Sequence, residues 1–237
     1  NSIASKVPNI STIAIMAVDE TVPLSAFTTQ LAYRLQQIVP TLHLDQNSPI
    51  KFGITRKTSF TQTEEVNLIR WLCEMEEAHN IVLYECAKGL TAWTQRCLRQ
   101  ADCILIVGWA DSNCKISDIE KHMLQNSQLV NARKELILLH SPKVDRPRGT
   151  LNWLRLRRGW CQAVHHVRFS LGSDPLIKSD MSSQWEQPYY RTFSSFFHRL
   201  QRRVYTGRLS RLSAATHIPS IIRRGAGGIW KRLRRKG

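Results

Sequence analysis

Two hydrophobic periods alternate along this chain between residues 11 and 168, and this alternation constrains the fold more than any other feature. Short runs rich in apolar and β-branched residues recur there, as expected for strands that are covered on both faces. These runs are 12–18, 43–45, 81–84, 103–107, 136–140 and 164–169, of which 43–45 gives the weakest signal.

Between these runs, apolar residues recur three and four positions apart, which is typical of helices with one buried face. These segments are 24–39, 64–78, 91–99 and 116–130. Thr63 precedes two glutamates and Ser117 precedes an aspartate, so acidic side chains lie at the positive end of each predicted helix dipole. Strands that alternate with helices require crossover connections. We therefore predict an α/β fold, with a mainly parallel, Rossmann-like sheet of about five or six strands and helices on both faces.

The alternation ends after residue 170, and this change suggests the domain boundaries. Residues 1–10 are interpreted as a partial N-terminal linker, 11–170 as the α/β domain, 171–190 as a linker rich in Ser and Pro, and 191–237 as an amphipathic helix and a basic tail. The predicted helix covers 191–205 and carries its apolar residues on one side: Phe193, Phe196, Phe197, Leu200 and Val204. Segment 46–62 is polar and is predicted to be a surface loop or a short insertion, and segment 141–149 is predicted to be another loop.

The charge of the chain is concentrated at its C-terminal end. The formal net charge is +16, of which +11 belongs to residues 171–237. Cations alternate there with apolar side chains, and a segment of this kind can bind an anionic membrane surface or nucleic acid. The alternative is a basic end that has no binding partner. The predicted contact residues are Arg223, Arg224, Trp230, Lys231, Arg232, Arg234, Arg235 and Lys236. No apolar run approaches the ~18 residues that a membrane-spanning helix needs.

The six cysteines stand at positions 73, 86, 97, 103, 114 and 161, and no two have the CxxC spacing of a zinc or redox site. A chain of this length does not need disulfides to fold, so buried free thiols in a reducing compartment are predicted.

The first predicted turn from strand to helix, 18–23, contains no glycine and carries Asp19 and Glu20. Binding of a phosphate at a helix N-terminus needs close approach of the backbone, which glycine permits and acidic side chains oppose. Dinucleotide binding is therefore not expected here. The chain also lacks a Walker A loop, a GxSxG nucleophile elbow and an HExxH helix.

Other candidate sites each have a simpler structural interpretation. The segment 108–112 is predicted to be a turn at the carboxyl end of a strand, where a small-molecule pocket is the less favoured alternative. His165 and His166 are adjacent on a predicted strand, so they point to opposite faces and cannot bind one metal together. The triplet Glu74, Glu76 and Glu77 is interpreted as the solvated face of a helix. Ser112, Cys114 and His122 lack a base in fixed geometry, so no catalytic, cofactor-binding or metal-binding residue is assigned.

Five blocks of this chain, in the same order, closely resemble the neuropathy target esterase family. The blocks are VPLSAFT at 22–28, AHNIVLY at 78–84, WTQRCLRQADCILIVG at 93–108, KELILLH at 134–140, and TLNWL at 150–154 with WC and HH following at 160–161 and 165–166. The resemblance implies a lysophospholipase or phospholipase that acts on phosphatidylcholine-type lipids at the cytoplasmic face of the endoplasmic reticulum membrane.

The same resemblance implies that the catalytic domain of such an enzyme is patatin-like, with a Ser–Asp dyad, a GGGxRG loop and a GxSxG serine. None of these elements occurs in this chain, so no catalytic residue carries over. The chain is therefore predicted to be a fragment: the non-catalytic α/β segment between cyclic-nucleotide-binding-like domains and the patatin domain, inactive alone and without a cofactor. Its expected partners are that missing hydrolase domain and the endoplasmic reticulum membrane surface. The alternative is a stand-alone binding module whose basic tail contacts anionic membrane or nucleic acid.

Overall fold

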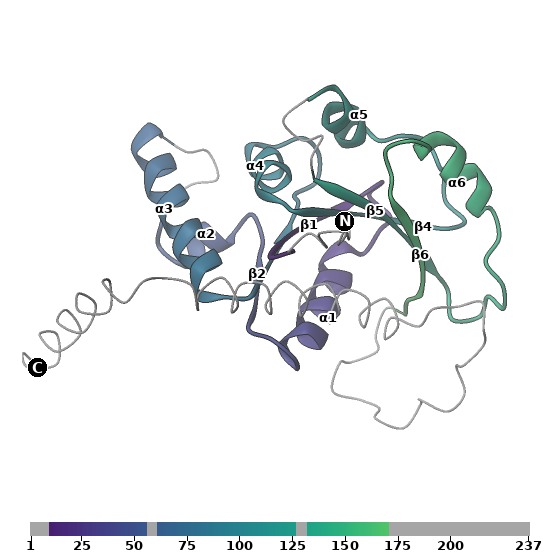
Figure 1. Ribbon diagram of the computed structural model, residues 1–237, viewed down its shortest axis with the longest axis horizontal. Helices are drawn as coiled ribbons and strands as arrows, with labels where there is room; N and C mark the ends of the chain where they lie inside the picture. The colour runs from purple at the N-terminus through teal and green to yellow at the C-terminus, as the bar shows by residue number, and fades with distance from the viewer. Residues whose placement is uncertain (1–9, 56–60, 127–131, 171–237) are drawn as a thin grey trace, which may run out of the picture.

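The computed structural model describes residues 10–55, 61–126 and 132–170 (Figure 1). Its strands form a single six-stranded sheet, parallel throughout, in the order β2-β3-β1-β4-β5-β6. The strands are β1 (Thr12–Ala17), β2 (Thr41–Leu44), β3 (Ile81–Glu85), β4 (Cys103–Trp109), β5 (Arg133–His140) and β6 (Ala163–Arg168). The predicted α/β fold with a parallel sheet is confirmed.

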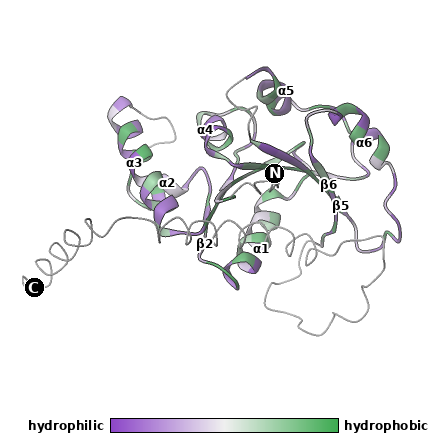
Figure 2. Cartoon of the chain, viewed as in Figure 1, coloured by the Kyte–Doolittle hydropathy of each residue, from purple (hydrophilic) through white to green (hydrophobic). Residues whose placement is uncertain are grey.

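Helices lie on both faces of the sheet, as predicted (Figure 1). They are α1 (Leu24–Gln36), α2 (Ser48–Lys51), α3 (Gln62–Ala78), α4 (Ala92–Gln100), α5 (Asp118–Gln125) and α6 (Thr150–Arg157). One apolar core lies under α1, and the other lies under α3, α4, α5 and α6. Figure 2 shows both hydrophobic and hydrophilic residues on the longer helices, as expected of helices that bury one face.

The starts of the helices follow from capping side chains. The Ser117 hydroxyl accepts from the Glu120 amide, and the Glu120 carboxylate accepts from the Ser117 amide, so the predicted start of α5 is confirmed. For α3 the predicted acidic side chains, Glu64 and Glu65, do lie in the first turn, but the helix begins two residues earlier than predicted, and its capping residue is Thr61, which forms the same reciprocal pair with Glu64. This capping box satisfies amides that otherwise lack partners in the first turn.

Two helices were not predicted. The short α2 lies within the segment expected to be a loop, and α6 follows the loop at 141–149. In α6, Trp153 is buried whereas Leu151 and Leu156 are exposed, so its apolar residues do not mark one face. The predicted helix at 116–130 ends at Gln125 in α5, and residues 127–131 lie outside the described residues.

Gly108 and Trp109 belong to strand β4 and not to the turn predicted at 108–112. Both pair with β5, opposite Leu138 and Leu139, and the turn begins at Ala110. A β-carbon at Gly108 would lie 2.8 Å from Cη2 of Trp153. Glycine is therefore needed because α6 packs its tryptophan directly against the backbone of β4.

All six cysteines are free thiols. The prediction of burial is confirmed for Cys86, Cys97 and Cys103, but Cys73 is exposed on α3. Burial raises the pKa of the Cys97 thiol, with a further contribution from its hydrogen bond to Cys86. Among the helices that the structure describes, none is long and apolar enough to cross a lipid bilayer.

Candidate functional site

The carboxyl ends of β1, β2 and β3 surround a hollow of about 1030 Å³. Its walls come from the turn between β1 and α1, the residues that follow β2, the loop after β3, and the start of α5. Open parallel sheets place their ligands at this edge. By its position, this hollow is therefore a candidate binding site.

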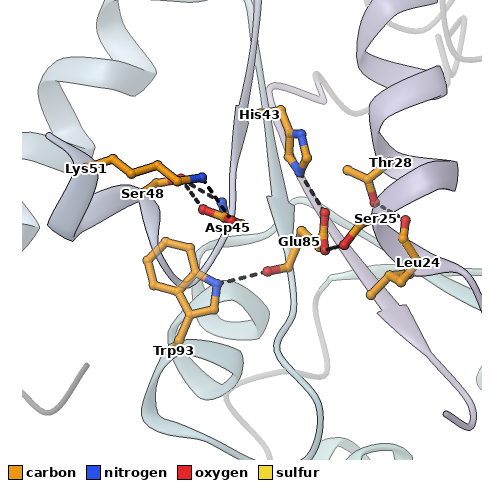
Figure 3. Close-up of polar contacts among 9 residues, drawn as sticks. All are labelled: Leu24, Ser25, Thr28, His43, Asp45, Ser48, Lys51, Glu85 and Trp93. Carbon is orange, nitrogen blue, oxygen red and sulfur yellow. Dashed lines mark hydrogen bonds and ion pairs between the residues drawn. The ribbon is translucent and has the colours of Figure 1, made fainter. Parts of the chain in front are cut away.

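A hydrogen-bonded group of three side chains lies at this edge (Figure 3). Glu85 is the last residue of β3, and its carboxylate accepts a hydrogen bond from the Ser25 hydroxyl at the start of α1. The other carboxylate oxygen is 2.8 Å from Nε2 of His43, on the neighbouring strand β2. The Glu85 backbone carbonyl accepts from the Trp93 indole at 2.9 Å. Both ends of this residue are thereby held in place.

The turn from Val18 to Ser25 has the length and the position of a phosphate-binding loop. That motif is a strand, the eight residues GxxxxGK[ST], and a helix, and its last hydroxyl binds Mg²⁺ together with an acidic residue on another strand. Here β1 ends at Ala17, Ser25 is the eighth residue after it, and α1 begins at Leu24. Counted from Ser25, the two glycines of the motif are replaced by Val18 and Pro23, and the lysine by Leu24.

These replacements remove what the motif uses to bind phosphate. Glycines allow the backbone to wrap around the phosphates, and the lysine supplies a positive charge. In this chain the only part of the motif that remains is the hydroxyl of Ser25. That hydroxyl donates directly to Glu85 across the position where the motif would hold a metal ion.

Among the described residues that line the hollow, carboxylates dominate and Lys88 is the single cation. The carboxylates belong to Asp19, Glu20, Asp45, Glu85 and Asp118. Burial tends to raise the pKa of Asp45, but the Ser48 hydroxyl at 2.6 Å and the Lys51 ammonium at 3.3 Å lower it overall. Asp45 is therefore ionised at neutral pH. An anionic phosphate would be repelled from this hollow.

A further hollow of about 820 Å³ lies at the carboxyl ends of β4 and β5, around the turn at 110–112. Beneath it, Nε2 of His140 is 2.9 Å from Nδ1 of His166. Burial lowers the pKa of His140 to about 4, with a further contribution from the repulsion that a protonated His166 would exert. Burial likewise lowers the pKa of His166. Both rings are neutral at pH 7. They form a structural pair at the wall of the hollow.

The structure keeps apart the side chains that the sequence singled out. His165 contacts Glu135 at 2.7 Å on one face of β6 while His166 contacts His140 on the other, so the predicted divergence of the two histidines is confirmed. Ser112 donates to Asp19 at 3.2 Å. Within the described ranges no hydrogen bond joins Ser112 to Cys114 or His122, and no cluster of His, Cys, Asp and Glu is placed to hold a metal ion.

Glu76, predicted to lie on the solvated face of a helix with Glu74 and Glu77, is only partly exposed. Its carboxylate accepts from the Tyr84 hydroxyl at 2.6 Å, and partial burial raises its pKa. Its neighbours Glu74 and Glu77 are exposed, as predicted. The cations predicted to contact membrane or nucleic acid, between Arg223 and Lys236, lie outside the described residues.

No local sequence pattern marks the group of Ser25, His43 and Glu85. Its members are separated by 18 and 42 positions and join only when three elements meet. One signal was available, because an acidic residue directly follows the buried run at 81–84. In a parallel sheet that position lies at the ligand-binding edge.

Residues 9–219 of this chain match the sequence model described as the neuropathy target esterase family P-loop like domain. Patatin-like phospholipase domain-containing protein 6 of Mus musculus is 38% identical over 220 residues, which cover 93% of this chain and 15% of that protein. Patatin-like phospholipase domain-containing protein 7 of Rattus norvegicus is 40% identical over 205 residues, covering 84% and 14%. Neuropathy target esterase sws of Drosophila erecta is 36% identical over 162 residues, covering 66% and 10%. The chain thus spans about 15% of the length of the curated relatives it matches most extensively.

Proposed function

Because this chain belongs to the neuropathy target esterase family, as its P-loop-like domain, we propose that it is a non-catalytic domain of a phospholipase. In this proposal the domain neither binds nucleotide nor hydrolyses lipid. It contributes to the enzyme by binding and positioning the patatin-like hydrolase domain. The finer proposal is that the enzyme hydrolyses lysophospholipids and phospholipids of the phosphatidylcholine type at the cytoplasmic face of the endoplasmic reticulum.

The observation that carries this proposal is the direct bond between Ser25 and Glu85 in a turn without glycine or lysine. A phosphate-binding loop keeps its serine and its acidic residue apart so that a metal ion and the phosphates fit between them. Here the Ser25 hydroxyl is hydrogen-bonded directly to the Glu85 carboxylate, and the surrounding carboxylates would repel an anion. The domain has the fold of a phosphate-binding domain, but its turn at 18–25 lacks the glycines and the lysine that bind phosphate.

A domain without chemistry of its own needs a surface for its partner, and we propose the outer face of α3 for this role. Val66 is 54% exposed and Ile69 is 43% exposed, and they lie three residues apart on one side of the helix. The opposite side of α3 buries Leu68 and Leu72 in the core. The helix thus presents one apolar stripe to the sheet and a second, smaller one outward, where it would contact the hydrolase domain.

The test is a titration of this chain with the patatin-like hydrolase domain of the same polypeptide, produced separately and followed by calorimetry. We expect saturable binding that the double substitution V66S/I69S weakens at least ~10-fold, since each buried apolar side chain contributes ~1.5–3 kcal/mol. The matched control is L151S on α6, an exposed leucine on a different helix, which should bind like the unmodified chain. Unchanged affinity in V66S/I69S would refute the assignment to α3.

The absence of catalysis is tested on this chain alone. Hydrolysis of lysophosphatidylcholine should stay at the rate of a buffer blank at every enzyme concentration, because the chain contains no GxSxG serine with a basic partner. Saturable turnover that scales with the amount of chain would overturn the proposal.

A second candidate function rests on the charge of the C-terminal end. With +11 in residues 171–237, this end would bind an anionic membrane surface and hold the domain there. Co-sedimentation with vesicles containing phosphatidylserine should fall sharply with salt and disappear when residues 218–237 are deleted. Binding that survives the deletion, or a preference for RNA over vesicles in competition, would contradict a membrane role.

A further inference from the structure

The face of the sheet that carries α1 is wider than α1 can cover. A helix with its side chains is ~10–12 Å across, and adjacent strands are ~4.8 Å apart, so one helix covers two or three strands. Helix α1 packs on β1, β2 and β3. Over the described ranges no second helix lies on this side, whereas the opposite face carries α3 to α6 (Figure 1).

The other half of this face, formed by β4, β5 and β6, is nevertheless buried, with apolar side chains beside one buried ion pair between β5 and β6. Ile137, Leu139 and Val167 are fully buried, and Phe169 is 2% exposed. Helix α1 reaches this half through Phe27, whose ring is 6.1 Å from that of Phe169. Burial of three strands across their width requires a second layer beside α1.

The chain beyond β6 supplies a segment of suitable chemistry and length. The family match continues to residue 219, about 50 residues past the end of β6, so this region belongs to the domain. Within it, residues 191–205 repeat apolar side chains every three or four positions, and four arginines with one histidine occupy the remaining sides. Fifteen helical residues span ~22 Å, close to the ~20–26 Å of β6 and β5.

The connection imposes no obstacle. The described chain ends at Ser170, directly after β6 and its half of the face, which α1 does not cover, and the next 20 residues can span up to ~70 Å. A helix could therefore be laid across β4, β5 and β6 in either direction.

We propose that residues 191–205 form a helix that packs its apolar side on β4, β5 and β6, next to α1, and completes the second layer of the domain. Phe193, Phe196, Phe197, Leu200 and Val204 form the buried side. The arginines of the segment lie on the outer surface. This inference is independent of the function proposed above.

The test uses hydrogen exchange in the full chain. The substitutions F196D/L200D place two carboxylates on the proposed buried side, and S195D/H198D place two on the opposite side as the matched control. In F196D/L200D, amides of β5 and β6 should exchange at least ~10-fold faster while β2 and β3 stay unchanged. The control should exchange like the unmodified chain. Equal exchange of β5 and β6 in all three proteins would overturn the proposal.

A second measurement decides the case even if F196D/L200D fails to fold. A benzoylphenylalanine photo-cross-linker replaces Leu200 in the otherwise unmodified chain, or His198 as the control. Irradiation should link position 200 to peptides of β4, β5 or β6 within one molecule, and position 198 should not. Links from position 200 to other elements or to a second molecule, or no link at all, would refute the packing.

Discussion

The substitution R157M tests the packing of α6 most sharply, because Arg157 is a fully buried cation. Its guanidinium donates to both oxygens of Glu120, at 2.8 and 3.0 Å, and neither side chain of this ion pair is exposed. It also donates to the Cys114 carbonyl at 2.9 Å and lies 4.6 Å from the centre of the Trp153 ring. These contacts tie α6 to α5 and to the turn before it.

Removal of one partner of a buried ion pair leaves the other charge without compensation. R157M should therefore lower the free energy of unfolding by ~3–5 kcal/mol. For a domain of this size ~1 kcal/mol corresponds to ~2–4 °C, so the unfolding temperature should fall by ~6–20 °C. In the double variant E120Q/R157M the buried carboxylate is gone, and the loss should be smaller than in R157M alone.

The free energy of unfolding is measured by urea and thermal unfolding for the unmodified chain, R157M, E120Q and E120Q/R157M. The matched control is K121M on α5, which removes the exposed ion pair between Lys121 and Asp118. It should leave the midpoint of urea unfolding unchanged. A loss below ~1 kcal/mol in R157M, or additive losses in the double variant, would refute the reasoning that the buried pair locks α6 in place.

Three further substitutions or conditions have defined outcomes. G108A should cost ~1–3 kcal/mol in urea unfolding, because its β-carbon would lie 2.8 Å from Trp153, and an equal loss in a W153L background would contradict that contact. The pKa of His140 is about 4 in the folded state and ordinarily 6.5, so below pH 6.5 the unfolded state takes up a proton first. The stability that depends on neutral His140 is therefore complete above pH 6.5 and is lost as the pH falls toward 4. H140Q should flatten the dependence of the free energy of unfolding on pH in this range. Y84F removes the 2.6 Å hydrogen bond to the partly buried Glu76 carboxylate and should cost ~1–2 kcal/mol, measured in the same way.

The sequence predicts the sheet well because buried parallel strands are continuous apolar runs. Residues 103–107 and 136–140 are such runs, and both lie in central strands of the structure. The weak run at 43–45 corresponds to β2, at the edge of the sheet, where His43 is partly exposed and the strand has only four residues. A short edge strand buries fewer side chains, so its pattern is fainter.

Helix α6 could not be predicted because its position depends on tertiary contacts. Leu151 and Leu156 are exposed while Trp153 and Arg157 are buried, so hydrophobicity does not indicate the inward face. What holds the helix is the close approach of Trp153 to Gly108 and the ion pair of Arg157. Both involve partners more than 30 residues away, which a local pattern does not contain.

The candidate site is intermediate between these cases. The absence of glycine in the turn after β1 is visible in the sequence, and it argues against a phosphate-binding loop of the usual chemistry. The closure of that loop by Ser25 and Glu85 is not visible, because the two residues are 60 positions apart. Their contact depends on β1 and β3 being neighbours in the sheet.

The measurement that tests the central claim most directly is a titration of the full chain with Mg²⁺ and ATP, and separately with Mg²⁺ and GTP, followed by thermal unfolding. Because Ser25 is bonded to Glu85 and carboxylates line the hollow, we predict an unfolding temperature that does not change up to millimolar nucleotide. A ligand at ~100 times its dissociation constant would stabilise the folded state by ~2.7 kcal/mol. A saturable rise of that size, abolished by a substitution in the turn at 18–25, would contradict the account and show that this domain still binds nucleotide.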